Sequence, residues 1–145
     1  MRKTFLWIHL VAAALVVVGV FLQVYLIASY FAGAGEDALD AHGIVGFMFI
    51  HALELIVFLA SLGAYWGLWR WVGWSFLLIL FGTVQIFLAP PDEDPASGWV
   101  HGLHGLFALF VALLAYALFR RSRREFALMR EPAVPAGGAP TRPAP

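Results

Sequence analysis

Long runs without a charged side chain constrain the fold of this chain more than any other feature. No acidic or basic residue other than His9 lies between Lys3 and Glu36, and further such runs continue as far as Arg120. A helix needs about 20 apolar residues to cross the hydrocarbon core of a bilayer, and a backbone exposed to lipid must satisfy its own hydrogen bonds. The sequence therefore predicts an all-α integral membrane protein, a four-helix bundle with spans at 5–31, 41–63, 66–89 and 99–119.

The first run is also compatible with a secretory signal, because it follows the basic residues Arg2 and Lys3. The apolar region of such a signal is about 7–15 residues long, and this run is nearly twice that length. We therefore expect a retained membrane helix.

The charged residues are distributed unevenly over the predicted loops. All nine lysines and arginines lie at the N-terminus, in the second loop or after the fourth span, whereas the first and third loops carry only acidic charges. The acidic loop residues are Glu36, Asp37, Asp40, Asp92, Glu93 and Asp94. The positive-inside rule therefore predicts a multi-pass protein of the inner (cytoplasmic) membrane, with both termini in the cytoplasm and both acidic loops outside.

This topology divides the chain into two parts. Residues 1–120 are predicted to form a four-span transmembrane domain, and residues 121–145 a basic, Pro/Ala-rich, disordered cytoplasmic tail. The chain has no cysteine, which excludes disulfides and thiolate-bound iron–sulfur clusters. It has no Gly-rich phosphate loop, Ser/His/Asp set or basic patch of the kind that binds nucleic acid, so we expect neither a hydrolytic or transferase site nor a nucleic-acid partner.

The chain contains a weak internal repeat with an offset of 62 residues. Gln23 aligns with Gln85, and nineteen residues further on His42 aligns with His104. An acidic loop separates the glutamine from the histidine in both halves. This pattern predicts a two-fold repeat of two-helix units, in which the second and fourth spans run parallel. All four polar side chains would then gather in the outer third of the bundle, where the glutamines would border a bound cofactor.

Paired histidines at matched depth on parallel helices suit a haem iron, because two imidazoles can fill the axial positions of a b-type haem. We therefore predict one haem b, held by His42 and His104. Gly46 and Gly105 would remove bulk beside the ligands, although glycine also permits close helix packing without a cofactor. The alternative for the histidines is a hydrogen bond to a headgroup, to a loop carbonyl or to one of the two glutamines.

A third histidine lies close to this predicted site. His101 precedes His104 by three residues, which places it about 60° away around an ideal helix. The repeat selects His104, because His101 aligns with Leu39 in the first loop. We expect His101 to be a hydrogen-bonding neighbour of the ligand or the alternative ligand.

A second polar pair lies deeper in the second span. His51 follows His42 by nine residues. On an ideal helix this spacing turns His51 roughly 180° away from the haem site predicted at His42. Glu54 lies one turn further on, within reach of the His51 ring. The pair is expected to be either a mutually satisfied packing contact or a site that handles protons or quinol. His9, near the cytoplasmic end of the first span, is expected to be an interfacial polar residue.

The repeated glutamine and histidine pattern resembles a family of small bacterial four-helix membrane proteins of unknown function. The matching residues are Gln23 with His42-Gly43, and Gln85 with Leu103-His104. The second histidine of that family is often followed by proline, where this chain has Gly105. A looser resemblance is to four-helix b-type cytochromes, including each half of haem A synthase, and by position it implies that His42 and His104 bind haem.

We therefore expect a membrane b-type haem-binding protein with bis-His ligation near the outer face, acting in electron transfer or as a haem-bearing subunit of a redox complex. Its expected partners are the lipid bilayer, a redox protein or membrane complex, and a quinone. Two alternatives remain open. One is a non-redox structural or accessory membrane subunit, and the other is a divalent-metal protein that binds copper or zinc through His42, His101, His104 and loop carboxylates.

Overall fold

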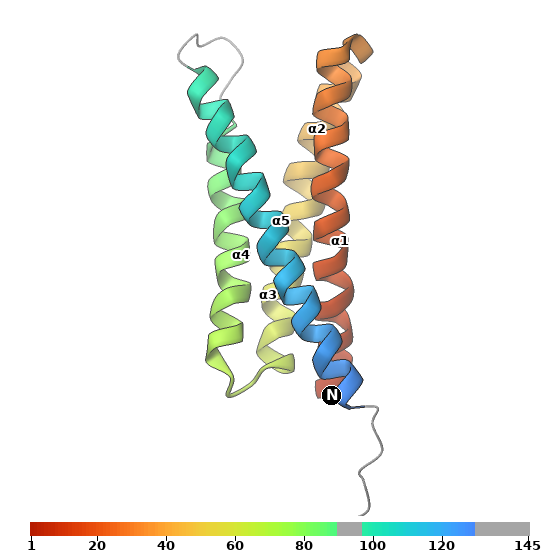
Figure 1. Cartoon of the computed structure of the whole chain (residues 1–145), viewed down its shortest axis with the longest axis vertical. Helices are drawn as coiled ribbons and strands as arrows, with labels where there is room; N and C mark the ends of the chain where they lie inside the picture. The colour runs from red at the N-terminus through yellow and green to blue at the C-terminus, as the bar shows by residue number, and fades with distance from the viewer. Residues whose placement is uncertain (90–96, 130–145) are drawn as a thin grey trace, which may run out of the picture.

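The chain folds into four long helical rods that run up and down in turn (Figure 1). The computed structural model describes residues 1–89 and 97–129, without the side chains of Ser97 and His101. The elements are α1 (Arg2–Ser29), η1 (Tyr30–Ala34), α2 (Glu36–Ile44), η2 (Val45–Ile50), α3 (His51–Ala64), α4 (Trp69–Phe87) and α5 (Ser97–Leu128). The η2 element is π-helical, whereas η1 is interrupted by the non-helical backbone angles of Gly33. The predicted all-α four-helix bundle is confirmed.

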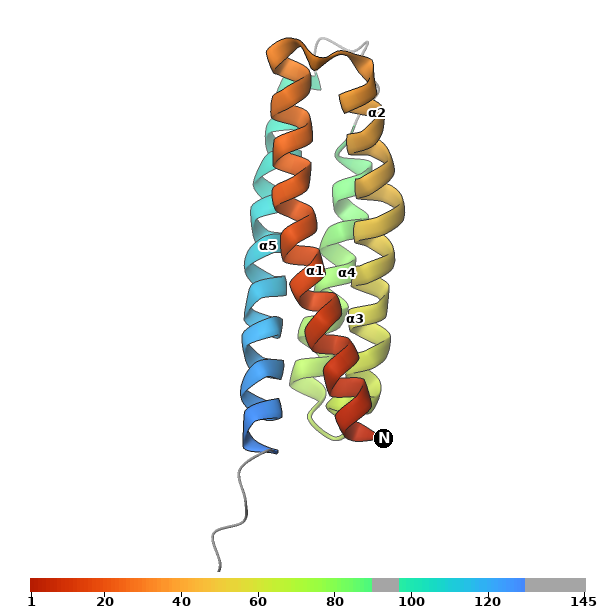
Figure 2. The ribbon, with the colours of Figure 1, turned by 90° about the vertical axis from the view of Figure 1, so that its right-hand side faces the viewer.

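Two of the rods are built from more than one element. The η1 segment extends α1 up to the kink at Gly33, and α2, η2 and α3 together form a single rod from Glu36 to Ala64. Gly33 and Gly35 have positive φ angles of 94° and 88°, a conformation that glycine adopts without steric cost. They make the reversal between the first two rods, which Figure 2 shows at the upper end of the molecule.

The fourth rod is longer than predicted. The span was expected to end at Phe119, but α5 continues to Leu128, and so it includes the first part of the predicted disordered tail. No glycine or proline occurs between Gly105 and Pro132, so nothing in the chain interrupts the helix there. An ion pair between Arg121 and Glu125, one turn apart, supports this extension. Residues 130–145 of the predicted tail lie outside the described part of the chain.

All four rods are long and apolar enough to cross a membrane. Large apolar side chains are exposed on the outer face of every rod, as Phe21, Leu59, Phe76 and Leu113 show. A water-soluble monomer rarely exposes contiguous apolar surface on this scale. Such a surface is compatible with contact to the hydrocarbon chains of a lipid bilayer.

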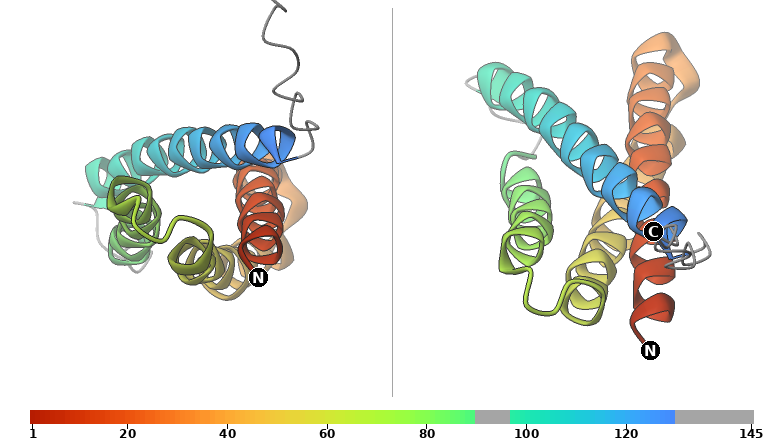
Figure 3. Two further views of the ribbon diagram at one scale, coloured as in Figure 1. Left: turned by 90° about the horizontal axis from the view of Figure 1, so that it is seen from below. Right: turned by 60° about the horizontal axis from the view of Figure 1, so that its bottom comes forward.

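The two ends of the bundle differ in charge. The end where α1 passes into α2 carries Glu36, Asp37 and Asp40, and we call it the acidic end. The opposite end, where Arg2, Arg70 and Arg121 lie, is the basic end. Viewed along the bundle, the rods form a ring in which α1 contacts α3 and α5, and α4 contacts the same two helices (Figure 3). Because α5 runs obliquely, it lies beside α4 at the acidic end and beside α1 at the basic end (Figure 1).

The centre of the bundle is closed by a layer of apolar side chains. Ala13, Val57, Leu78 and Leu118, one from each rod, are fully buried and belong to one core cluster. Small residues on α1, including Ala12 and Ala13, let the neighbouring backbones approach closely, as is typical of helices packed in membranes. The layer separates two groups of buried polar residues, one toward each end of the bundle.

Candidate functional site

The acidic half of the bundle contains a cavity of about 290 Å³ that is lined by all four rods. Its polar lining residues are Gln23, His42, His51, Glu54, Gln85 and His104, and its other walls are apolar residues and glycine. These six are the principal polar residues that the sequence singled out within the spans, and the fold brings them into one site.

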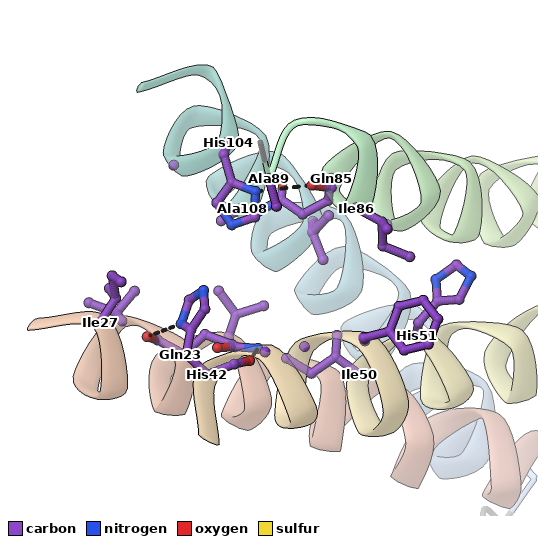
Figure 4. Close-up of a pocket in the computed structure, with 18 of the residues that line it drawn as sticks. Gln23, Ile27, His42, Ile50, His51, Gln85, Ile86, Ala89, His104 and Ala108 are labelled. Atoms are coloured by element: carbon purple, nitrogen blue, oxygen red, sulfur yellow. Dashed lines mark hydrogen bonds between the residues drawn. The ribbon is translucent and has the colours of Figure 1, made fainter. Parts of the chain in front are cut away.

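The two histidines of the repeat face each other across this cavity (Figure 4). His42 lies on α2 and His104 on α5, and their ring centroids are 6.1 Å apart with the ring planes inclined at 51°. In simple geometry, two imidazoles that share one metal at about 2.0–2.1 Å per bond, the distance typical of zinc, have centroids roughly 6 Å apart. The spacing of the two rings therefore fits a single metal ion held between them.

Each ring is held by a backbone carbonyl of the preceding rod. The Nδ1 atom of His42 lies 3.2 Å from the carbonyl oxygen of Gln23, and Nδ1 of His104 lies 3.0 Å from that of Gln85. A carbonyl only accepts hydrogen bonds, so Nδ1 of each ring is the donor and Nε2 of the neutral ring keeps its lone pair. Metal-binding histidines are commonly oriented in this way.

The two glutamines border the same cavity and have unsatisfied oxygens. Gln23 donates from Nε2 to the carbonyl of His42 at 2.9 Å. The Oε1 atoms of Gln23 and Gln85 are buried, and neither accepts a hydrogen bond from the described residues. A buried carbonyl without a donor is costly. The two unsatisfied oxygens lie at repeat-equivalent positions beside the cavity.

The glycines around the histidines have different surroundings. A Cβ atom added at Gly43 or Gly105 would meet no atom within 4 Å, whereas one at Gly46 would collide with the amide nitrogen of Gln23. Gly105 and Gly43 thus leave open space beside the rings. Gly46 also lines the cavity, but its small size is already required by the contact between α1 and η2.

The orientation predicted for the deeper pair was wrong. His51 and Glu54 line the same cavity as His42, although an ideal helix would turn His51 to the opposite side. The reason is η2, where the N–H of His51 bonds to the carbonyl of Gly46, five residues earlier. A π-helical turn holds about one extra residue, and that residue rotates everything after it by roughly 100°. Glu54 therefore returns to nearly the same face as His42.

The deeper pair is closely packed and hydrogen-bonded. Nδ1 of His51 lies 3.0 Å from Oε2 of Glu54, whose side chain is 1% exposed. The carboxylate lies directly against α4 at Gly82, where any Cβ atom would collide with it. Gly82 could not be identified from the sequence, because a glycine in an apolar helix is ordinary on its own.

His9 was expected at the interface but is fully buried near the basic end. Its Nδ1 bonds to Oγ of Ser122 at 2.7 Å, and its Nε2 bonds to Oγ of Ser75 at 3.1 Å. The Tyr65 hydroxyl lies 2.9 Å from the same Ser122 oxygen, and the Tyr65 ring packs edge-on against His9. Burial raises the pKa of the Tyr65 hydroxyl. Both ring nitrogens of His9 are thus satisfied by hydroxyl groups, an arrangement that joins α1, α4 and α5.

The remaining predicted residues are only partly described. His101 lies in the first turns of α5, but its side chain is outside the described residues, as are Asp92, Glu93 and Asp94. Within residues 1–89 and 97–129, no group of three or more His, Asp or Glu side chains is arranged to hold a bare metal ion. A haem differs from such an ion because the porphyrin supplies the other ligands, so that two histidines suffice.

Comparison of the chain with protein-family models, with curated proteins and with solved structures finds no match. The resemblances drawn from the glutamine and histidine pattern therefore stay predictions.

Proposed function

We propose that this chain is a b-type cytochrome of the inner membrane, which binds one haem b between His42 and His104. It would serve in electron transfer or as the haem-bearing subunit of a redox complex. The positive-inside rule favours an orientation with the acidic end, and so the haem, toward the outer face of the membrane.

The observation that carries this proposal is the geometry of the two histidines. Their rings lie 6.1 Å apart across an otherwise largely apolar cavity, and each donates from Nδ1 to a carbonyl nineteen residues earlier in the chain. These bonds are also the ones expected under the alternative, in which each histidine bonds to one of the two glutamines. What favours ligation is that both halves repeat the same bond and that it leaves Nε2 of each neutral ring with its lone pair. A pair of oriented imidazoles in an apolar slot is what axial ligation requires.

The residues around the pair also suit a flat, apolar ligand. Gly43 and Gly105 leave open space beside the rings, and Ile86, Ala108 and Leu109 provide apolar walls. The protein holds the ligand nitrogens in place and limits water, whereas a bound haem would supply one-electron chemistry. The unsatisfied Oε1 atoms of the glutamines give donors on a ligand, or ordered water, a place to bind.

The absorption spectrum of the purified protein tests this proposal. Protein from haem-replete cells should show a b-type spectrum in its oxidised and reduced forms, and His42→Ala or His104→Ala should abolish it. His51→Ala, on the same rod as His42 but deeper in the cavity, is the matched control and should keep the spectrum. His101→Ala should keep it as well.

Two outcomes would contradict the assignment. A colourless wild-type protein from such cells would rule out the haem and leave the accessory-subunit interpretation. Bleaching by His101→Ala but not by His104→Ala would show that the repeat selected the wrong ligand. Metal analysis of the same sample tests the copper or zinc alternative.

A further inference from the structure

The deep end of the histidine cavity contains a buried carboxyl group that haem ligation does not use. Glu54 lies twelve residues after His42, which places it about 18 Å further along the rod at the usual rise per residue. Its side chain is almost completely buried and bonds to His51. An ionisable group at this depth in a membrane is costly, and by default it marks a functional site.

Two features of the fold are needed to place this carboxyl group in the cavity. The π-helical η2 rotates α3 so that Glu54 faces inward, and Gly82 leaves the space on α4 that its carboxylate occupies. The equivalent position in the second half of the repeat is Tyr116, on the uninterrupted helix α5. Tyr116 is 48% exposed, on the surface of the bundle that points away from its core. The buried acid is thus a property of the first half only.

The cavity also extends to the lipid-facing surface. Three of its lining residues, Val24, Phe47 and Leu109, are 53%, 63% and 57% exposed. In a bilayer this surface faces the hydrocarbon chains, so the cavity can be reached by a ligand dissolved in lipid. Among the described residues, the only polar side chains at the deep end of the cavity are His51 and Glu54, and the residues around them are apolar or glycine.

We propose that Glu54 and His51 bind the head group of a lipid-soluble quinone at the deep end of this cavity. A quinone ring is flat and apolar, and its oxygens need a hydrogen-bonding partner inside an apolar pocket. The carboxyl and imidazole groups offer both donors and acceptors there, and such polar groups fix the orientation of a ligand in an apolar site. The inference deepens the proposed function, on which it rests, by naming the redox partner of the same cavity.

The test measures quinone binding to the haem-loaded protein in lipid nanodiscs. A decyl-chain benzoquinone is titrated in, and the bound ligand is measured as the saturable excess over empty nanodiscs. Decylbenzene, which has the same carbon skeleton but an aromatic ring without the oxygens, should not compete. The wild type should bind about one quinone per chain.

Variants locate the site within the cavity. Glu54→Leu should weaken binding by roughly tenfold or more, since an unpaired quinone oxygen is left in an apolar pocket. Glu54→Gln keeps hydrogen-bonding groups and should stay within about threefold of the wild type. Gly82→Ala, which displaces the carboxylate while keeping it, should resemble Glu54→Leu. Tyr116→Leu, the repeat-equivalent change on the outer face, should bind as the wild type does.

The outcomes separate this inference from the proposed function. Absence of saturable binding, or equal affinity in the wild type, Glu54→Leu and Gly82→Ala, overturns the quinone site even when the haem spectrum is intact. A colourless wild type overturns the haem assignment, whatever the quinone titration shows. The haem spectrum of each variant, recorded before titration, also reports whether it has folded.

Discussion

The two halves of the chain place their histidines alike and diverge deeper in the bundle. His42 and His104 each bond to the carbonyl of a glutamine nineteen residues earlier. Twelve residues after each histidine, however, the first half has the buried acid Glu54 and the second half has Tyr116 on the outer face. The structural cause is η2, which has no counterpart in α5. A repeat can thus build a symmetric site, and one π-helical turn can then make part of it asymmetric.

Removing the π-helical turn should have the largest effect on the difference between the buried Glu54 and the exposed Tyr116. Deletion of Met48, an exposed residue of η2, should restore α-helical register and rotate Glu54 out of the cavity toward lipid. We expect the free energy of unfolding to fall by at least about 3 kcal/mol, the scale of placing a charged residue at the centre of a membrane helix. Unfolding in denaturing detergent mixtures measures this.

Met48→Ala is the control for that deletion, because it trims the same exposed side chain and keeps the register. It should change stability by no more than about 0.5 kcal/mol. If the deletion variant were as stable as Met48→Ala, the π-helical turn would not be what positions the acid.

The two serines beside His9 provide the next test, in the basic half of the bundle. His9→Leu removes two hydrogen bonds and leaves the hydroxyl groups of Ser75 and Ser122 with fewer partners. We expect a loss of about 1–3 kcal/mol in unfolding free energy. The haem spectrum should be unchanged, because the apolar central layer separates His9 from the cavity. A bleached His9→Leu protein that remains folded would contradict this separation.

Gly82 and Gly73 compare a crowded and an open position on the same helix. Gly82→Ala should cost about 1–3 kcal/mol, because the new methyl group collides with the Glu54 carboxylate. Gly73→Ala meets no atom within 4 Å and should gain up to about 1 kcal/mol from better helix propensity. Thermal unfolding of the two variants in one detergent measures the difference. Equal stabilities would show that the position of the Glu54 carboxylate does not depend on the small size of Gly82.

The smallest expected effects concern the glutamines. Gln23→Ala and Gln85→Ala leave the backbone carbonyls that hold the histidine rings in place, so the b-type spectrum should persist. Each should weaken haem retention by no more than roughly tenfold, the value of about one hydrogen bond. Haem transfer to apomyoglobin measures this loss. A large effect in one variant alone would show that the two halves do not hold the ligand equally.

The part of the site at the acidic end could be predicted because its signal is local and repeated. The spacing from Gln23 to His42 recurs from Gln85 to His104, and uncharged runs define the helices that carry these residues. The ends of the helices were less predictable. Arg120 marks where the chain becomes charged, but a helix continues until a residue breaks it, and so α5 extends to Leu128.

The deeper polar residues could not be placed from the sequence for different physical reasons. The segment Val45–Ile50 contains no residue type that predicts a π-helical hydrogen bond between residues i and i+5. The rotation of Glu54 into the cavity could therefore not be predicted. The partners of His9 lie 66 and 113 residues away. Serines in apolar helices were the available signal for them, but only the packing of the rods shows that they meet.

The apolar central layer limits how a proton could move through the bundle. Ala13, Val57, Leu78 and Leu118 lie between the polar residues of the cavity and the His9 cluster, and none of them can accept or relay a proton. The bundle therefore has no proton wire through its centre along these side chains. On the proposed function, proton exchange at Glu54 would then take place through polar residues on the side of the acidic end, and the layer would act as a barrier toward the basic end.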